Sequence, residues 1–398
     1  PVLHTCHASL LSSVRAPHQG AITPTLTSNG SPVNLSRITR IAAIGAVAAL
    51  ALTGCAVNEG TPDSSATPDA PAALAGTLVG AGASSQQVAV QTWTAGFQTS
   101  NPDVTVDYDP AGSGTGRESF QQGAISFAGS DRAFKLDEIS TGKFGACAPG
   151  TNIIEIPAYI SPIAIVFNLD GVKSLNMDAA TIAGIFAGTI TNWNDAAIAK
   201  ANPDAKLPDL AISPVHRSDK SGTTGNFTDY LAATAGDIWT HGSVEEWPVQ
   251  AGEAAQGTSG VVSAVKGGQG AIGYADASQA GTLGTVAVGV GGEFVPYSPK
   301  AAAAVADASP LEEGRTAGDL AIAIDRTTEE AGVYPIILIS YLIGCEDYAD
   351  KAVAPLVKGF FGYAISAEGQ DAAAASAGSA PISASLREQA AAAVALIK

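Results

Sequence analysis

The chain has 398 residues, of which 46% are hydrophobic and 14% charged, so it is long enough for two packed domains and its composition excludes a disordered protein. Its 37 aspartates and glutamates outnumber its 20 lysines and arginines, which gives a net charge of −17. This charge disfavours nucleic acid and anionic lipid surfaces as partners, but it permits a local anion site because salt screens distant charges within about 10 Å.

Residues 1–54 have the pattern of a leader that ends in a bacterial lipoprotein signal. Arg37 and Arg40 precede an uncharged run, residues 41–52, which is too short to cross a membrane and has the length of a signal hydrophobic region. The sequence LTGC follows, and its final residue, Cys55, corresponds to the lipid-modified cysteine of a lipobox. An ordinary signal peptide followed by a chance cysteine is the alternative interpretation.

The mature protein is expected to begin at Cys55, and translation is expected to start near Val33, so that residues 1–32 are not translated. Cleavage before Cys55 removes three of the 20 basic residues and none of the 37 acidic ones, so the mature net charge is −20. Residues 55–75 are rich in Pro, Ser, Thr, Asp and Ala, which is typical of a flexible tether. We therefore expect a protein on the extracytoplasmic face of the cell membrane, anchored by lipid.

From residue 76 onward, short apolar runs alternate with helical patterns. Short strands that run into polar turns are expected within residues 76–84 and 124–131, an alternating strand at 104–108, and buried strands at 161–168, 270–276 and 334–343. Helices between them are indicated by apolar residues at helical spacing, as at Val90, Trp93 and Phe97. This alternation predicts an α/β protein whose sheets are parallel or mixed and are covered by helices on both faces.

Two cysteines follow the lipidation site, Cys147 and Cys345. Because the chain is expected outside the cytoplasm, we predict a disulfide between them, with two buried free thiols as the alternative. A metal site is not expected, since only two histidines follow Cys55.

Four polar, glycine-rich loops follow expected strands, at residues 80–85, 112–116, 129–131 and 217–224. Open α/β sheets bind ligands beyond the carboxyl ends of their strands, so these loops are the candidate site. In the last loop, SDKSGTTGNF follows Arg217 directly, and a helix is expected to begin within it. The unpaired N–H groups and positive dipole end of such a helix attract anions, although an ordinary helix cap beside a surface arginine is the alternative.

Other functions of these loops find no support in the motifs. The SGTTG run lacks the P-loop pattern, and GSGTG at residues 112–116 lacks the spacing of a dinucleotide-binding loop. The sequence has neither the G-x-S-x-G elbow of a hydrolase nor the H-E-x-x-H motif of a metalloprotease. A serine hydrolase would also need a general base, for which only His216 and His241 follow the expected cleavage site.

Taken together, the loops resemble those of the PstS family, the phosphate-binding proteins of bacterial ABC phosphate importers. The matching segments occur in order and are GAGAS (80–84), AGSGTG (111–116), GSD (129–131), HRSDKSGTTGNFTDYL (216–231) and GAIGYA (270–275). The resemblance covers about residues 76–398. Its most specific motif is R-x-D-x-S-G-T, here Arg217, Asp219, Ser221, Gly222 and Thr223.

This resemblance implies a periplasmic-binding-protein-like fold of type II, with two α/β lobes, two crossover segments and a ligand cleft between the lobes. We expect the crossovers near residues 157–158 and 334–335. One lobe then combines residues 76–157 with 335–398, and the other spans residues 158–334.

The resemblance also implies which residues bind the anion. The expected phosphate-binding residues are Ser84, Ser85, Ser113, Asp131, Arg217, Ser221, Gly222 and Thr223. Asp219 is expected to hold Arg217 in place. Two positions depart from the family pattern and leave their effects open: Ser85 stands where the family often has Phe, and Lys220 where it often has Gly. Asp131 is expected to accept the proton that phosphate keeps and sulfate lacks, and so to reject sulfate.

The protein is accordingly expected to bind inorganic phosphate as a monomer, without a cofactor or metal, and to deliver it to a membrane permease. It is not expected to be an enzyme. A binder of another tetrahedral oxyanion and a secreted phosphate-ester hydrolase are the alternative functions, and a second role at the cell surface stays open.

Overall fold

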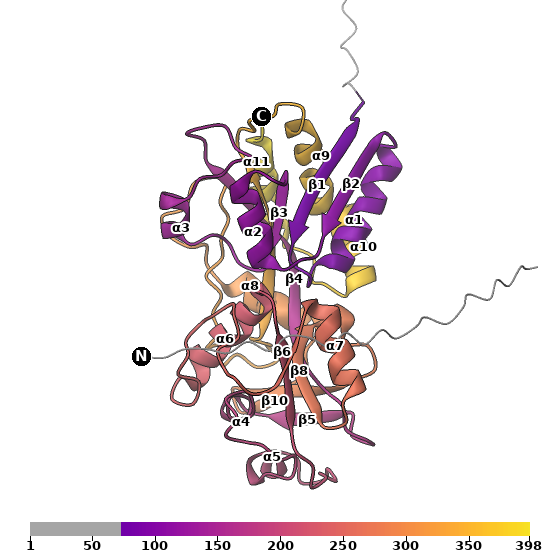
Figure 1. The fold of residues 1–398 in the computed structure, drawn as a ribbon, viewed down its shortest axis with the longest axis vertical. Coiled ribbons are helices and arrows are strands. Elements are labelled where there is room, and N and C mark those ends of the chain that lie inside the picture. The colour runs from indigo at the N-terminus through magenta and orange to yellow at the C-terminus, as the bar shows by residue number, and fades with distance from the viewer. Residues whose placement is uncertain (1–72) are drawn as a thin grey trace, which may run out of the picture. The chain divides into compact units, whose positions relative to one another are not determined.

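A mixed β-sheet covered by helices runs through residues 73–398, the part of the chain that the computed structural model describes (Figure 1). The expected leader, the expected lipidation site Cys55 and nearly all of the expected tether lie outside these residues. Among the helices of residues 73–398, none has both the length and the apolar character needed to cross a membrane.

Within residues 73–398 all six expected strands are present, and five further strands were not expected. In chain order the elements are β1 (Gly76–Gly82), α1 (Gln87–Ser100), β2 (Val104–Asp109), α2 (Ser113–Gln122), β3 (Phe127–Ser130), α3 (Leu136–Thr141), β4 (Ile153–Phe167), β5 (Ser174–Met177), α4 (Ala179–Phe186), α5 (Ala196–Ala201), β6 (Ser213–Arg217), α6 (Gly222–Ala235), β7 (Glu253–Ala255), α7 (Gly257–Gly267), β8 (Ala271–Asp276), the 3-10 helix η1 (Ala277–Gln279), β9 (Gly284–Val290), β10 (Glu293–Val295), α8 (Pro299–Ala308), β11 (Ile337–Cys345), α9 (Ala354–Ile365), α10 (Ala367–Ala377) and α11 (Ala384–Ala395).

The strands pair in the order β2-β1-β3-β11-β4-β8-β6-β7, and β9 pairs with β4, β5 and β10 at one side. Strands β1, β2 and β3 are parallel, as are β6, β7 and β8, whereas β11 and β4 run antiparallel to their neighbours. The prediction of a mixed sheet is therefore confirmed.

Strand β4 joins the two halves of this sheet. Residues 153–162 pair with β11, and residues 163–167 pair with β8. We call the elements on the β11 side the upper lobe (β1–β3, β11, α1–α3 and α9–α11) and those on the β8 side the lower lobe (β5–β10 and α4–α7). Figure 1 shows the two groups above and below β4.

The strand expected at residues 161–168 begins eight residues earlier than predicted. It is β4, which runs from Ile153 to Phe167 and is buried along its whole length. Two prolines, Pro157 and Pro162, suggest that the strand is interrupted, because a proline has no N–H group to donate to a neighbouring strand. The structure accommodates the first of them with a register shift opposite Ser340 and Tyr341 of β11, so the strand continues past it.

Each lobe is built on aromatic side chains at the spacing that predicted its helices. In α1, Val90, Trp93 and Phe97 are buried, and the Phe97 ring packs edge-on against Phe360 of α9. In α6, Phe227 is fully buried and stacks on Tyr274 of β8, with ring centroids 4.4 Å apart. Burial of these rings fixes how the helices lie on the sheet.

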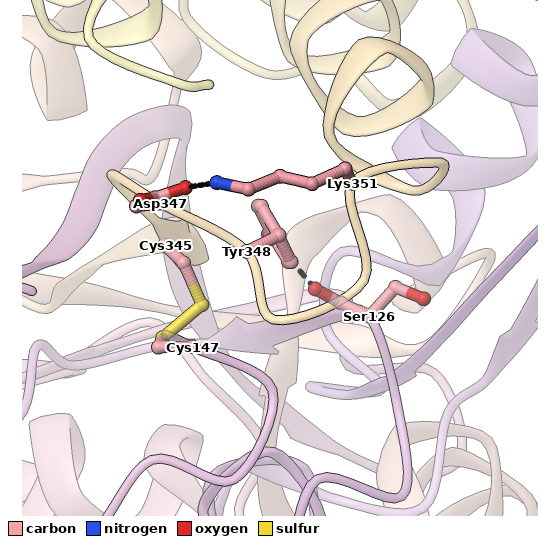
Figure 2. Close-up of a disulfide and its surroundings, with 6 residues drawn as sticks. All are labelled: Ser126, Cys147, Cys345, Asp347, Tyr348 and Lys351. Atoms are coloured by element: carbon pink, nitrogen blue, oxygen red, sulfur yellow. Dashed lines mark hydrogen bonds and ion pairs between the residues drawn. A yellow bond between two sulfur atoms is a disulfide. The ribbon is translucent and has the colours of Figure 1, made fainter. Parts of the chain in front are cut away.

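A disulfide joins Cys147, in the segment before β4, to Cys345 at the end of β11, which confirms the predicted pairing (Figure 2). The loop that follows β11 is held by two further contacts. Tyr348 donates a hydrogen bond of 2.9 Å from its hydroxyl to the carbonyl oxygen of Ser126, and Lys351 pairs with Asp347. The disulfide therefore fixes the periphery of the upper lobe.

Replacing both Cys147 and Cys345 by serine is expected to lower the free energy of unfolding by about 2–5 kcal/mol, because the bond restricts the unfolded chain across a separation of 198 residues. Urea titration followed by circular dichroism measures this loss. A reductant should lower the unfolding midpoint of the wild type and leave that of the double variant unchanged. Equal unfolding free energies for the two oxidised proteins would contradict the prediction.

Asp276 is a buried carboxylate at the end of β8, beside the strand that links the lobes. Its Oδ1 accepts hydrogen bonds from the Tyr159 hydroxyl at 3.0 Å, from the Ser278 backbone N–H at 2.9 Å and from the Ser278 hydroxyl. Burial raises the pKa of Asp276 to about 6, although these hydrogen bonds act in the opposite direction. The charged form is therefore unfavourable in the folded protein.

Because the folded-state pKa of Asp276 lies above its ordinary value of 3.8, its stabilising contribution is complete below about pH 4 and is lost as the pH rises through about 6. We expect this group to make the protein less stable at pH 8 than at pH 4 by about 2–3 kcal/mol. Asp276→Asn should remove that part of the pH dependence, measured as unfolding free energy at several pH values. An unchanged difference between pH 4 and pH 8 in the variant would show that the carboxylate carries no such cost.

Candidate functional site

The four predicted loops converge on one buried cluster of polar side chains between the lobes. Ser84 and Ser85 lie between β1 and α1, Ser113 begins α2, and Asp131 follows β3. The lower lobe contributes the end of β6 and the start of α6. All the predicted anion-binding residues are buried: Ser84, Ser85, Ser113, Asp131, Arg217, Ser221, Gly222 and Thr223.

The carboxylate of Asp131 is the centre of this cluster. Its Oδ1 accepts a hydrogen bond from the Ser85 hydroxyl at 2.5 Å and another from the Ser340 hydroxyl of β11. Its Oδ2 accepts from the Thr223 hydroxyl at 3.0 Å, and its backbone N–H donates to the Ser113 hydroxyl at 3.1 Å. Asp131 thus joins both loops of the upper lobe to the first turn of α6.

Burial raises the pKa of Asp131 above its ordinary value. The hydrogen bonds from Ser340, Ser85 and Thr223 and the positive charge of Arg217 act in the opposite direction but do not cancel the effect. A carboxylate in such a place is a strong hydrogen-bond acceptor, because no water competes for its oxygens.

Arg217 is held as a fork by Asp219. The Arg217 Nε donates to Oδ1 of Asp219 at 2.8 Å, and Nη2 donates to Oδ2. The backbone N–H of Gly257 also donates to Asp219 Oδ1, at 3.0 Å. Burial alone would raise the pKa of Asp219, but the hydrogen bonds and charge of Arg217 lower it below its ordinary value. The pair therefore stays ionised and fixes the plane of the guanidinium group.

Helix α6 begins inside the cluster, as its sequence predicts. Ser221 caps the helix, because its hydroxyl accepts a hydrogen bond from the Thr224 backbone N–H at 3.1 Å. The next residue must be glycine: a Cβ at Gly222 would lie 2.5 Å from the Ser113 hydroxyl and 2.7 Å from the Cβ of Asp131. The backbone of the lower lobe thereby approaches the upper lobe more closely than any side chain would allow.

A second helix of the lower lobe also reaches the cluster, and its residue was missed by the sequence analysis. Thr258, the second residue of α7, donates from its backbone N–H to the Ser84 hydroxyl at 3.0 Å, and the two hydroxyl oxygens are 3.0 Å apart. The run GTSG at residues 257–260, followed by Val261 and Val265 at helical spacing, is the same kind of signal as the start of α6. Thr258 could therefore have been predicted from the sequence.

Ser340 was missed as well, since residues 334–343 indicate only a buried strand. It is a polar residue among apolar neighbours in β11, and its hydroxyl donates a hydrogen bond to Oδ1 of Asp131. The two departures from the family pattern also have defined places. Ser85 is fully buried and donates to Asp131, whereas the Lys220 side chain is partly exposed and pairs with Glu118 of α2 at 2.9 Å.

Chemically, the cluster offers hydroxyl groups, the N-termini of two helices, one guanidinium fork and one carboxylate acceptor. This donor set suits a small oxyanion that keeps at least one proton. Within residues 73–398 no three His, Cys, Asp or Glu side chains come together in a way that could hold a metal ion.

Comparison with known proteins identifies the family of the chain. Residues 67–368 match the family described as the PBP superfamily domain. The chain is 33% identical over 333 residues to the phosphate-binding protein PstS 3 of Mycobacterium tuberculosis, an alignment that covers 80% of this chain and 88% of that protein. It is 33% identical over 298 residues to PstS 2 of the same species, covering 72% of this chain and 79% of that protein.

Among solved structures, a high-affinity periplasmic phosphate-binding protein bound with phosphate has the same fold. The two superpose with a TM-score of 0.64 at 23% sequence identity, over 80% of this chain and 93% of the other. The fold is thus that of the periplasmic binding proteins, and the extent and identity of the sequence matches place the chain in the PstS family of phosphate-binding proteins.

Proposed function

We propose that this protein captures inorganic phosphate in the cluster around Asp131, outside the cytoplasm, and delivers it to the membrane permease of an ABC importer. The observation that carries the proposal is that the fork of Arg217, the first turn of α6 and the carboxylate of Asp131 meet in one buried place. Family membership supports it, because the relatives are phosphate-binding proteins rather than enzymes.

The bound anion would be held mainly by neutral donors. Hydroxyl groups come from Ser84, Ser113 and Ser221, and backbone N–H groups come from Ser85, Gly222 and Thr223, whose own hydroxyl donates to Asp131. Arg217 adds a charge-assisted pair. A buried dianion needs nearly every oxygen satisfied, and this set provides donors from both lobes without a large positive patch.

Asp131 would provide the selectivity for phosphate. Phosphate near neutral pH keeps a proton that the carboxylate can accept, whereas sulfate has none and would face a buried negative charge. A site with a buried acceptor rejects a ligand that lacks the matching donor by several orders of magnitude. The hydrogen bonds from Ser85 and Thr223 would hold the carboxylate in the orientation needed for this bond.

Ligand capture would proceed by hinge closure of the two lobes. We propose the lobe boundaries expected from the sequence, residues 76–157 with 335–398 for one lobe and 158–334 for the other. Strand β4, which pairs with β11 at one end and with β8 at the other, supports a crossover within it.

The setting of the protein follows from its N-terminal sequence. We propose that Cys55 carries a lipid anchor, that the tether after it lets the binding domain reach the permease, and that the protein acts as a monomer on the extracytoplasmic face of the membrane. The disulfide between Cys147 and Cys345 fits an oxidising compartment. Labelling of Cys55 with radioactive palmitate in cells would test the anchor.

Calorimetric titration of the purified protein, stripped of bound anion, is the direct test of the ligand. We expect one phosphate per chain and no response to sulfate. In Asp131→Asn the ratio of phosphate to sulfate affinity should fall by about 100-fold or more, because the acceptor for the phosphate proton is gone. An unchanged ratio in the variant would remove Asp131 from selectivity, and a folded wild type that binds neither anion would reject the whole proposal.

Arg217→Met is expected to weaken phosphate binding by at least about 100-fold, because the buried anion loses its charged partner. The variant also leaves Asp219 unpaired, so Arg217→Met with Asp219→Asn removes both charges of the pair. If Arg217 contacts the anion, the double variant stays weak; if Arg217 only neutralises Asp219, the double variant recovers. Lys200→Met, on the exposed face of α5, is the matched control and should bind as the wild type does.

A further inference from the structure

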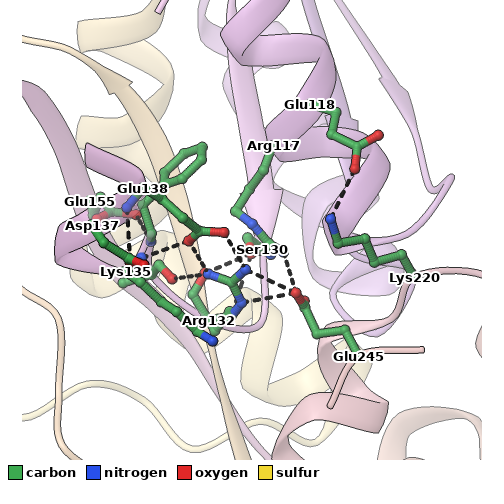
Figure 3. Close-up of polar contacts among 12 residues, drawn as sticks. Arg117, Glu118, Ser130, Arg132, Lys135, Asp137, Glu138, Glu155, Lys220 and Glu245 are labelled. Carbon is green, nitrogen blue, oxygen red and sulfur yellow. Dashed lines mark hydrogen bonds and ion pairs between the residues drawn. The ribbon is translucent and has the colours of Figure 1, made fainter. Parts of the chain in front are cut away.

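A cluster of buried and half-buried ions crosses between the lobes beside the anion site (Figure 3). Glu245 accepts a hydrogen bond of 2.6 Å from Nη2 of Arg117 and one of 3.0 Å from Nε of Arg132, both to its Oε2. Arg132 is also held by Glu138, with Nη1 to Oε2 at 2.7 Å and Nη2 to Oε1 at 2.9 Å. We call these four side chains the interlobe ion cluster.

The members of the interlobe ion cluster come from opposite lobes. Arg117 lies in α2, Arg132 follows β3, and Glu138 lies in α3, so three members belong to the upper lobe. Glu245 lies in the segment between α6 and β7 of the lower lobe. It is the one member that any separation of the lobes would pull away from the others.

The interlobe ion cluster stands directly behind three loops of the anion site. The backbone carbonyl of Glu245 accepts a hydrogen bond of 3.0 Å from the N–H of Ser221, the cap of α6. Arg132 is the residue after Asp131, and Arg117 donates from Nη1 to the Ser130 hydroxyl, the residue before Asp131, at 2.6 Å. Movement of Glu245 therefore acts on both sides of the site.

The interlobe ion cluster also borders a cavity of about 1010 Å³ that both lobes line. Arg132, Glu138 and Glu245 stand in its wall, together with Asp131 of the anion site. Much of the space between the lobes here is thus not filled by packed side chains. The contact of Glu245 with the two arginines crosses between the lobes at the wall of this cavity.

Charge balance makes Glu245 the critical member. The Arg117 side chain is 3% exposed and that of Glu245 11% exposed, so both depend on each other rather than on water. Burial alone would raise the pKa of Glu245, but the two guanidinium groups lower it below its ordinary value, and it is ionised at neutral pH. Without its charge, Arg117 and Arg132 would lie close together in the upper lobe with only Glu138 to offset their positive charges.

We propose that Glu245 is an interlobe latch: a positioning residue that binds Arg117 and Arg132 when the lobes close and thereby sets how slowly phosphate is released. The proposal rests on the proposed function, since it concerns the same site. In the open state the three side chains are hydrated and their attraction is small, so the latch acts on the closed state and therefore on the release rate.

Phosphate exchange on the purified full chain tests the latch. The protein is loaded with radiolabelled phosphate and its release is followed after a large excess of unlabelled phosphate is added. Glu245→Gln keeps the shape of the side chain and removes its charge, and it should release phosphate about 10- to 100-fold faster while the association rate changes by less than about threefold.

The chain offers a matched control and a rescue. Glu118→Gln breaks another ion pair between the lobes, the one with Lys220. The side chains of Glu118 and Lys220 are 55% and 38% exposed, so this variant should change the release rate by less than about twofold. Adding Arg132→Gln to Glu245→Gln removes the repulsion between two arginines of the upper lobe, which closure strengthens by excluding water. The double variant should therefore release phosphate at least about threefold more slowly than Glu245→Gln alone. A residue that only supported the fold would show no such rescue.

Two outcomes would overturn the latch while leaving phosphate binding intact: release from Glu245→Gln at the wild-type rate, or a double variant that releases phosphate faster than Glu245→Gln. If Glu245→Gln does not fold, Arg132→Gln alone replaces it, with faster release expected and an unchanged rate overturning the proposal.

A measurement without phosphate separates failure of the latch from failure of the proposed function. Spin labels at positions 143 and 200, exposed residues of the upper and lower lobes, report the interlobe distance. A wild type that does not bind phosphate rejects the proposed function alone. The latch proposal is then supported if Glu245→Gln lengthens the distance between the labels, and it is rejected if the wild type and Glu245→Gln give the same distance distribution.

Discussion

The carboxylate of Asp131 is the point on which the two lobes depend for their alignment. It is buried, so its oxygens must be satisfied by protein donors, and these come from Ser85 and Ser340 of the upper lobe and from Thr223 of the lower lobe. Gly222 allows the backbone of α6 to come close enough for Thr223 to reach it. Satisfying one acidic side chain therefore dictates both the residue types at the start of α6 and the closeness of the lobes.

This constraint explains how a protein with a net charge of −17 can hold an anion. Arg217 is neutralised by Asp219, and Asp131 brings a second carboxyl group, so the site has no excess of positive side chains. Attraction must then come from oriented hydroxyl and N–H dipoles at contact distance, including the starts of α6 and α7. The choice among oxyanions would then rest on the carboxylate of Asp131, which can accept a proton from the ligand, as a patch of positive charge cannot.

The parts of the site that lie in continuous motifs could be predicted, and the parts supplied by distant strands could not. The loop after β6 carries Arg217, Ser221 and Thr223 in one short run, and the helix after it is marked by apolar spacing. Ser340 lies inside a strand whose pattern indicates only burial, and its contact with Asp131 depends on the antiparallel register of β11 against β3. Register is set by the whole sheet, so local patterns do not contain it. The early start of β4 could not be predicted for the same reason, because the bulge that accommodates Pro157 forms in the pairing of β4 with β11.

The interlobe ion cluster shows why charged residues are the hardest to interpret from sequence. Glu245 is 128 residues from Arg117 and 113 from Arg132, and nothing in its neighbourhood distinguishes it from Glu246 beside it. Only the fold decides that one of these glutamates meets two arginines of the other lobe. That separation has a physical consequence: the residues that we propose to bind the anion lie within the site, while the residue that we propose to hold the lobes together lies behind it. Affinity can then be changed through the release rate without altering the donors and acceptor that choose the ligand, because the free energy of closure and the free energy of recognition reside in different contacts.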